Sequence, residues 1–186
     1  MKREDEKKLI QKIKAGNFRQ FERLIEEYQK ALFVFIWRMV RDEDDAKDIC
    51  QDTFFKAYKK IKSFKEESKF SSWLFKIGYR KALDFMAKKK RQHTILHKME
   101  TKSELSGSEK EFEVKDADSR IGQIIDNLHP NYRIPLHLFY KEEMTYTEIA
   151  SVMRIPMNTV KSYIFRGKEI IRDKLSRLGQ WNKQPV

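Results

Sequence analysis

The stretch TYTEIASVMRIPMNTVKSYIFRGKEIIRDKL, residues 145–175, contains two helical patterns separated by a short break. Thr145 and Glu148 have the spacing of a capping box, in which each side chain accepts a hydrogen bond from the other residue's backbone amide, so a helix is predicted to begin here. Pro156 lacks an amide donor and restricts the residue before it, which predicts a tight turn over residues 154–156. The order of helix, turn and helix is that of a motif whose second helix enters the major groove of DNA.

The second helix of this motif is predicted to be amphipathic. Its apolar side chains recur at helical spacing on one stripe with Gly167, and they are Val160, Ile164, Ile171 and Leu175. The opposite face is predicted to be exposed and to bind DNA through Thr159, Lys161, Ser162, Phe165 and Arg166. Lysine and arginine can reach guanine acceptors, and an apolar group can meet a thymine methyl. A solvated helical hairpin is the alternative, and the formal net charge of +12 argues against it.

The composition of the whole chain favours an all-α protein. The 186 residues include only six glycines and four prolines, and 40% hydrophobic residues are enough to build cores. Cys50 is the single cysteine, so an internal disulfide is excluded. The charged start MKREDEKKLI lacks the apolar core of a secretion signal, and the longest apolar run, residues 31–37, is too short to span a bilayer. We expect a cytoplasmic protein with no membrane insertion.

The distribution of charge and apolar residues predicts two small helical domains joined by a flexible linker. Residues 92–118 are poor in apolar side chains and rich in serine, threonine and mixed charges, which is typical of a linker. The N-terminal domain is therefore predicted over residues 1–91, and the C-terminal domain, which contains the helix-turn-helix, over residues 119–186.

Within the N-terminal domain, one predicted helix is acidic on its outer face. Residues 40–52 hold six acidic residues against two basic ones, and the outer face carries Asp45, Asp48, Gln51 and Asp52. Such clusters are usually only solvated. In a chain as basic as this one, a locally acidic helix is better suited to docking a basic protein surface, so we predict a protein-binding face here.

The next helical segment combines basic and aromatic residues. Residues 53–91 hold thirteen lysines and arginines against three acids. In single-strand binding, cations follow the phosphates while aromatic rings stack on unpaired bases. The residues predicted to do this are Phe64, Lys69, Trp73, Lys76, Arg80 and Lys88. For each ring, a place in the hydrophobic core is the competing interpretation.

No combination of residues in the sequence predicts catalysis. There is no glycine-rich phosphate loop and no serine nucleophile motif. His93 and His97 have the i, i+4 spacing of zinc ligands, but no convincing third ligand accompanies them. We therefore expect no enzyme activity, no metal, no cofactor and no small-molecule substrate.

Four segments occur in a distinctive order: DDAKDICQDTFFKAY (residues 44–58), KFSSWLFKIGYRKALDF (69–85), LHPNYRIPLHLFY (128–140) and MTYTEIASVMRIPMNTVKSYIFRGKE (144–169). In this order they resemble the bacterial sigma factors of the extracytoplasmic-function (ECF) type in the sigma-70 family. The resemblance implies a factor that directs core RNA polymerase to specific promoters. A stand-alone helix-turn-helix regulator, which would not need the acidic and the basic aromatic helices, is the alternative function.

The resemblance also implies roles for the three predicted surfaces. The acidic face would meet the clamp helices of the largest polymerase subunit, the basic aromatic segment the opened −10 promoter strand, and the exposed face of the last helix the −35 element. An anti-sigma protein would be a further partner. The chain departs from the family pattern at Arg154 and Asn158, where relatives often have glycine, and Asn158 is expected to cap the last helix. Arg80 and Tyr163 also replace residues that are common in the family.

Overall fold

The structure, a computed structural model, describes residues 3–99 and 120–177, and all regular structure within these two ranges is helical. The predicted all-α fold is therefore confirmed. The chain divides into two compact units, residues 1–110 and residues 111–186, and each is described here by itself. Most of the predicted linker lies outside the described residues.

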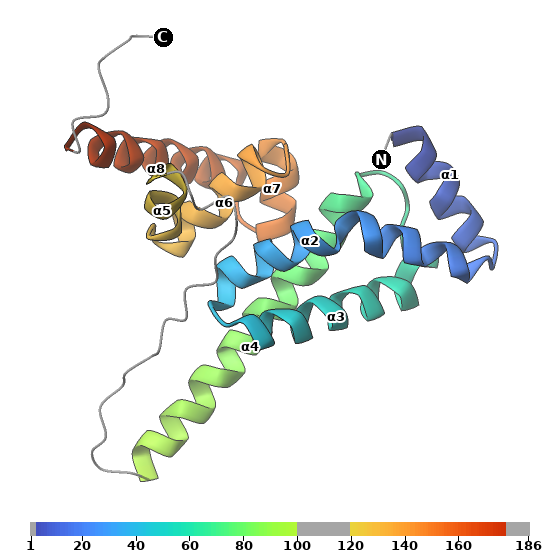
Figure 1. Ribbon diagram of the computed structural model, residues 1–186, viewed down its shortest axis with the longest axis horizontal. Helices are drawn as coiled ribbons and strands as arrows, with labels where there is room; N and C mark the ends of the chain where they lie inside the picture. Colours follow the sequence, from blue (N-terminus) through green and yellow to red (C-terminus); the bar gives the residue numbers. More distant parts are fainter. Residues whose placement is uncertain (1–2, 100–119, 178–186) are drawn as a thin grey trace. The chain divides into compact units, whose positions relative to one another are not determined.

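Over residues 3–99, the first unit contains four α-helices and two short 3-10 helices, drawn from blue to green in Figure 1. In chain order they are α1 (Arg3–Lys14), η1 (Phe18–Gln20), α2 (Phe21–Val40), α3 (Glu43–Lys60), η2 (Ile61–Ser63) and α4 (Phe70–Met99). The helices α2, α3 and α4 pack against one another, and α1 packs against η1 and η2.

The core of this unit is built from the apolar stripes of the three packed helices. Phe35 of α2 and Phe75 of α4 are fully buried, with ring centroids 5.0 Å apart. Burial of such side chains is the main favourable term in folding. Gly78 allows α4 to approach α2 closely, since a Cβ atom at this position would lie 3.0 Å from Leu32 Cδ1.

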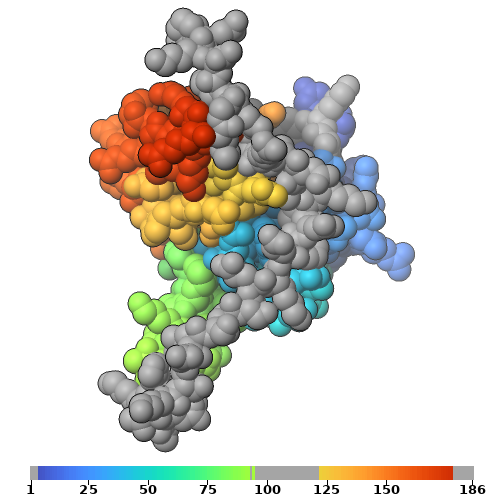
Figure 2. Space-filling model, turned by 60° about the vertical axis from the view of Figure 1, so that its left-hand side comes forward, coloured from blue at the N-terminus to red at the C-terminus, as the bar shows by residue number. Residues whose placement is uncertain are grey.

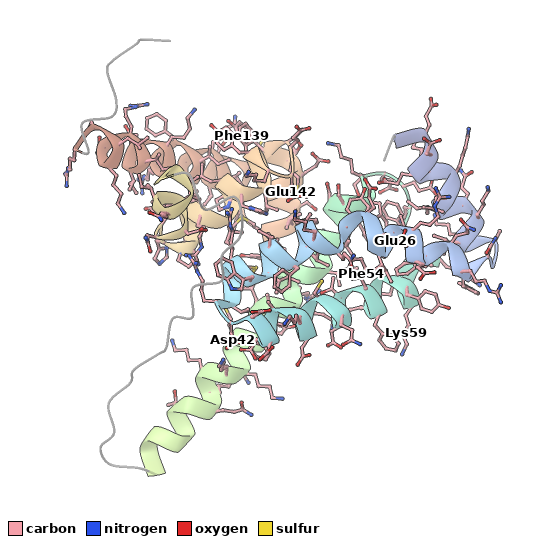
Figure 3. The ribbon with its side chains drawn as sticks, viewed as in Figure 1. Glu26, Asp42, Phe54, Lys59, Phe139 and Glu142 are labelled. Carbon is pink, nitrogen blue, oxygen red and sulfur yellow. The ribbon has the colours of Figure 1, made fainter. Side chains whose placement is uncertain are left out.

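Local chemistry sets the ends of the helices in the first unit. Gly16 has φ +106°, a backbone conformation that glycine adopts without strain, and it lies just beyond the end of α1. Asp42 caps α3, because its side chain accepts a hydrogen bond of 2.9 Å from the backbone amide of Asp45. Figure 3 labels Asp42 at this end of α3.

The helix α4 is longer than the sequence predicted. The expected N-terminal domain ended at residue 91, whereas α4 continues to Met99, within the range expected to be a linker. Residues 92–99 contain no glycine or proline, and they include the apolar Ile95, Leu96 and Met99, so the sequence offers no helix breaker at the expected boundary. Figure 1 shows α4 extending well beyond α3.

The second unit contains α5 (Arg120–Asp126), α6 (Pro130–Tyr140), α7 (Tyr146–Met153) and α8 (Met157–Arg177). The predicted capping box is present at the start of α7: the amide of Glu148 donates to Thr145 Oγ1, and the amide of Thr145 donates to Glu148 Oε2 at 2.8 Å. The helix α7 ends at Arg154, which has left-handed φ +56°.

The predicted cap at Asn158 is wrong. The helix α8 begins at Met157, and the carbonyl of Pro156 accepts hydrogen bonds from the amides of Thr159 and Val160. Proline is well suited to this boundary because it cannot donate a helical hydrogen bond itself, and the helix begins two residues earlier than a cap at Asn158 would place it.

The core of the second unit forms where α8 crosses α6 and α7. Val160 and Ile164 of α8 are buried together with Leu136 and Leu138 of α6. Gly167 lies at the closest approach, since a Cβ atom there would be 2.7 Å from Leu136 Cδ1. Figure 2 shows α8, in red, lying against the yellow segment that contains α5 and α6.

Candidate nucleic-acid interface

The exposed face of α8 has the composition predicted for a DNA-reading surface. Lys161, Ser162, Phe165 and Arg166 are all exposed, and Thr159 is half-buried. Phe165 is 61% exposed, the highest value among the exposed large hydrophobic side chains of the described residues. Its ring lies on the same exposed face as the basic Lys161 and Arg166. The four exposed side chains lie on the surface of α8 and leave its buried stripe intact.

Tyr163 does not belong to this exposed face. It is half-buried, and its ring meets that of Tyr132 on α6 edge to face, with centroids 5.9 Å apart. Such a contact is favourable beyond the area that it buries. Tyr163 therefore supports the position of α8 on α6.

The four residues of the predicted acidic face all lie on α3. Asp48, Gln51 and Asp52 are exposed and Asp45 is half-buried. Lys89 Nζ lies 2.7 Å from Asp45 Oδ2, so a basic residue of α4 pairs directly with one of the acids. This hydrogen bond raises the pKa of the Lys89 ammonium group, because only the charged form donates to the carboxylate in this way.

A second ion pair of the same kind joins Lys81 of α4 to Asp52 of α3, with 2.7 Å between Nζ and Oδ2. The sequence predicted an acidic face and a basic helix as separate surfaces. In the structure these two ion pairs connect the two surfaces. Their partners are 29 and 44 residues apart in the sequence. Sequence spacing could not reveal this, because it depends on how α4 packs against α3.

An apolar groove lies beside the acidic face, between η1, α2 and α3. It has a volume of about 900 Å³, and its lining includes Gln51, one of the residues predicted to bind protein. Its aromatic lining residues are Phe18, Phe21, Phe33, Phe54, Phe55 and Tyr58. Figure 3 labels Phe54 where α2 and α3 lie next to each other. The groove places an exposed aromatic surface next to charged residues.

The sequence pattern did not predict this groove. Two of its aromatic residues are exposed, Tyr58 to 38% and Phe55 to 57%. The adjacent pair Phe54 and Phe55 carried the signal, because two neighbouring residues on a helix cannot both face the same core. Phe18 lies in the short segment after Gly16, where no helical periodicity indicates which way a side chain points.

The basic aromatic segment divides between core and surface. Phe64 is only 4% exposed, and its ring centroid lies 5.1 Å from that of Trp73. Trp73, Lys69 and Lys76 are half-buried, while Arg80 and Lys88 are exposed. The structure therefore places Phe64 beneath the surface that Trp73 and the basic residues form. The core interpretation holds for this ring, as it does for the fully buried Phe75.

The two histidines of the second unit take structural positions. No group of three His, Cys, Asp or Glu side chains suited to a metal occurs among the described residues. His129 caps α6 through Nδ1, and the buried His137 lies 3.3 Å from Glu142 Oε1. The side chains of His93 and His97 lie outside the described ones. In the described part of the chain, no helix has the length and apolar character needed to cross a membrane.

Comparison with known proteins identifies both units. The family model Sigma-70 region 2 matches residues 24–92, and the model Sigma-70, region 4 matches residues 118–171. The ECF RNA polymerase sigma factor SigW of Bacillus subtilis is 30% identical, over 92% of this chain and 97% of its own length. The RNA polymerase sigma-H factor of Pseudomonas aeruginosa is 29% identical, over 94% of this chain and 96% of its own length.

A solved structure supports the fold. The sigma factor RpoE of Bartonella quintana, in a co-crystal structure with the anti-sigma factor NepR, matches with a TM-score of 0.66 and 22% identity. The match covers 84% of this chain and 96% of that one. At this level of identity, the likeness concerns the arrangement of the helices.

Proposed function

The chain belongs to the family of ECF RNA polymerase sigma factors, and we infer from this that it directs core RNA polymerase to a set of promoters and promotes initiation there. The observation that carries this conclusion is the presence of region 2 and region 4, in that order, in a chain similar to a sigma factor over 92% of its length. A stand-alone helix-turn-helix regulator would need only the second region. The factor contributes binding and no catalytic step of its own.

The exposed face of α8 is proposed to read the −35 element as duplex DNA. Its members are Thr159, Lys161, Ser162, Phe165 and Arg166, of which all but Thr159 are exposed. Arginine can bind guanine through two hydrogen bonds, and a phenylalanine ring can contact a thymine methyl. The exposure of Phe165 supports this role, because a thymine methyl would remove its ring from water.

The surface around the start of α4 is proposed to hold the unpaired −10 strand. Trp73 offers a half-buried ring for stacking, and the basic residues beside it, Lys69, Lys76, Arg80 and Lys88, supply charge for the phosphates. Phe64 contributes indirectly, because its buried ring packs against Trp73 and is not itself available for stacking.

The acidic face of α3 and the aromatic groove beside it are proposed to form one docking surface for core polymerase. Asp45, Asp48, Gln51 and Asp52 would meet the clamp helices of the largest subunit. Gln51 also lines the groove, so the charged and the apolar parts are continuous. This combination resembles other protein interfaces, in which an apolar centre is surrounded by polar residues.

Regulation by a partner protein is also proposed. RpoE of Bartonella quintana, whose fold this chain shares, was solved in complex with an anti-sigma factor. An anti-sigma protein that covers one or both units here would keep the factor from polymerase and from DNA. Because polymerase and the chromosome are its other partners, we propose that the protein works in the cytoplasm.

The direct test is reconstituted transcription. The purified chain is added to core RNA polymerase with fragmented genomic DNA of its own organism, and the RNA ends are mapped. We expect initiation at a small set of sites that share two sequence elements. Initiation identical to that of core enzyme alone would contradict the proposal, whereas DNA binding without polymerase would favour the stand-alone regulator.

A further inference from the structure

Lys14, the last residue of α1, ties that helix to the loop between η2 and α4. Its Nζ donates a hydrogen bond of 2.5 Å to the carbonyl oxygen of Phe64 and lies 2.7 Å from Glu66 Oε1. The same ammonium group lies 5.6 Å from the centroid of the Phe64 ring. One side chain of α1 therefore contacts the backbone, a carboxylate and an aromatic ring of the loop.

These contacts are partly shielded from water. The side chains of Lys14 and Glu66 are each 24% exposed, so solvent screens their attraction less than it does for a fully exposed pair. A lysine that served only solubility would extend into water and would not contact a backbone carbonyl 50 residues away.

The backbone of the loop is strained at the residue that Lys14 holds. Glu66 has φ +62°, a left-handed conformation that is unfavourable for a residue with a Cβ atom. Strain of this kind persists only where surrounding contacts impose it. The ion pair with Lys14 is such a contact, so α1 contributes directly to the shape of the loop.

The loop in turn supports the surface assigned to the −10 strand. Phe64 is buried against Phe70, with ring centroids 5.7 Å apart, and against Trp73 at 5.1 Å. Lys69 ends the loop, and its carbonyl accepts a hydrogen bond from the amide of Trp73. A shift of the loop would therefore move both a basic and an aromatic member of that surface.

We propose that Lys14 is a positioning residue that holds residues 64–69 in the shape that receives the unpaired promoter strand. It acts through the loop and does not contact DNA itself. This assignment rests on the proposed function of the surface around α4. It extends the promoter-opening machinery to α1, which lies outside the residues matched to region 2.

The first experiment separates opening from binding. Holoenzyme is assembled with the wild type, Lys14→Gln, Lys14→Arg or Lys12→Gln on a duplex promoter recovered in the transcription test above. Permanganate reactivity then gives the opening rate, and a gel-shift titration gives closed-complex affinity. We expect Lys14→Gln to open the promoter about threefold to tenfold more slowly with unchanged closed-complex affinity.

Two further variants are controls for this result. Lys14→Arg should retain promoter opening, since its guanidinium can reach both partners. Lys12→Gln is the matched control for loss of an exposed charge on the same helix.

Two variants of Glu66 distinguish positioning from the alternatives. If Lys14 bound phosphate directly, Glu66→Gln would free its ammonium group from the ion pair and speed promoter opening. A positioning role instead predicts slower promoter opening. Glu66→Gly removes the ion pair but also relieves the left-handed strain, so thermal stability should change little while opening slows as in Lys14→Gln. Wild-type opening by both Glu66 variants would overturn the proposal.

Hydrogen exchange reports on the loop without polymerase. The amide of Phe64 donates to the carbonyl of Ile61 at 3.1 Å, so its exchange rate measures loop opening. We expect exchange about threefold to tenfold faster in Lys14→Gln and unchanged in Lys12→Gln. If exchange is unchanged in Lys14→Gln while the wild-type protein initiates transcription, only the role of Lys14 is overturned. If the wild-type protein initiates transcription at no promoter, the proposed function is overturned, and with it the connection between the loop and DNA.

Discussion

Asp52 on α3 and Lys81 on α4 form an ion pair of 2.7 Å between the helix assigned to polymerase and the helix assigned to DNA. Asp45 and Lys89 repeat this relationship further along α4. Asp52 and Lys89 are both largely exposed, so each pair stabilises the fold by about 1 kcal/mol at most. Their importance lies elsewhere: a charge change on either helix alters the electrostatic environment of the other.

Charge reversal on the acidic face should weaken the complex with core polymerase. Asp48→Lys together with Asp52→Lys replaces two attractions by two repulsions, which is expected to cost several kcal/mol, roughly 2 to 5, if both contacts are close. A fluorescence anisotropy titration with labelled protein measures the change. Asp5→Lys, an exposed acid on α1, is the control and should leave the affinity unaltered.

The ion pair permits a sharper version of this experiment. The double variant Asp52→Lys with Lys81→Asp restores the pair with reversed polarity, so the thermal stability lost in Asp52→Lys should return. Binding to polymerase should not return, because the lysine would then face a basic surface. Recovery of polymerase affinity in the double variant would mean that Asp52 acts only within the protein.

Loss of charge near Trp73 should impair promoter opening more than closed-complex formation. Lys76→Ala with Arg80→Ala removes two cations that would follow the phosphates of the melted strand. Permanganate footprinting measures opening, and Lys7→Ala with Lys8→Ala on α1 provides a control of equal charge. A double variant that opened normally but bound duplex promoter poorly would contradict the assignment to the unpaired strand.

Arg166→Ala should reveal whether α8 reads a base or a phosphate. Loss of a bidentate contact to guanine is expected to cost about 1 to 3 kcal/mol and to relax preference at one base pair, whereas loss of a phosphate contact would weaken all sequences alike. Binding to a set of single-base variants of the −35 element separates the two cases. Wild-type preference at every position would show that Arg166 does not read the bases.

Phe165→Ala and Lys161→Ala should differ in their dependence on salt. Removal of the ring changes no charge, so affinity should fall while the slope of log K against log[salt] stays the same. Removal of a lysine that neutralises a phosphate should reduce the magnitude of that slope by about one. Circular dichroism should be preserved in both variants, because both side chains are exposed.

Gly167→Ala should destabilise the second unit. A Cβ atom would lie 2.7 Å from Leu136 Cδ1 and 3.3 Å from Tyr132 Cβ, and both neighbours belong to the packed surface of α6. Such overpacking is expected to cost about 1 to 3 kcal/mol, which exceeds the gain of about 1 kcal/mol in helix propensity. Thermal unfolding measures the change. Gly78→Ala, with 3.0 Å to a single Leu32 methyl, should be milder, and equal effects of the two would contradict the crowding argument.

Cys50 should react slowly with alkylating agents at neutral pH. Burial raises the pKa of its thiol from its ordinary value to about 11, because the thiolate loses hydration in the apolar groove. The labelling rate by iodoacetamide should therefore continue to rise between about pH 10 and pH 11, where a thiol of ordinary pKa has already levelled off. A plateau near pH 10 would mean that the thiol is hydrated in solution.

Sequence patterns predicted the elements of the fold where a local rule decides them. The capping box at Thr145 and the apolar stripe of α8 follow from terminal chemistry and periodicity, and the structure confirms the capping box and the burial of Val160, Ile164 and Leu175. The end of α4 was missed because no glycine or proline marks a helix end at residue 91. Asn158 was taken for a cap because its side chain suits one, whereas Pro156 sets the boundary.

The candidate site was predictable as a set of residues but not as an arrangement. The exposed side chains of α8 follow from one helix alone. By contrast, the burial of Phe64, the pairing of Lys81 with Asp52 and the contact between Lys14 and Glu66 each depend on segments far apart in the sequence. Composition identified the basic aromatic segment, yet only packing decides which of its rings reach the surface.

The turn before α8 has a consequence for the robustness of the protein. Arg154 adopts a left-handed backbone that glycine would adopt freely, and this costs about 1 kcal/mol. Arg41, at the end of α2, has a similar conformation, but its guanidinium lies 5.0 Å from the Trp37 ring, which offsets the strain. The exposed Arg154 instead adds a positive charge immediately before the helix proposed to read DNA. A substitution at this single position would therefore change both the stability of the turn and the charge next to that helix, without altering any side chain of its exposed face.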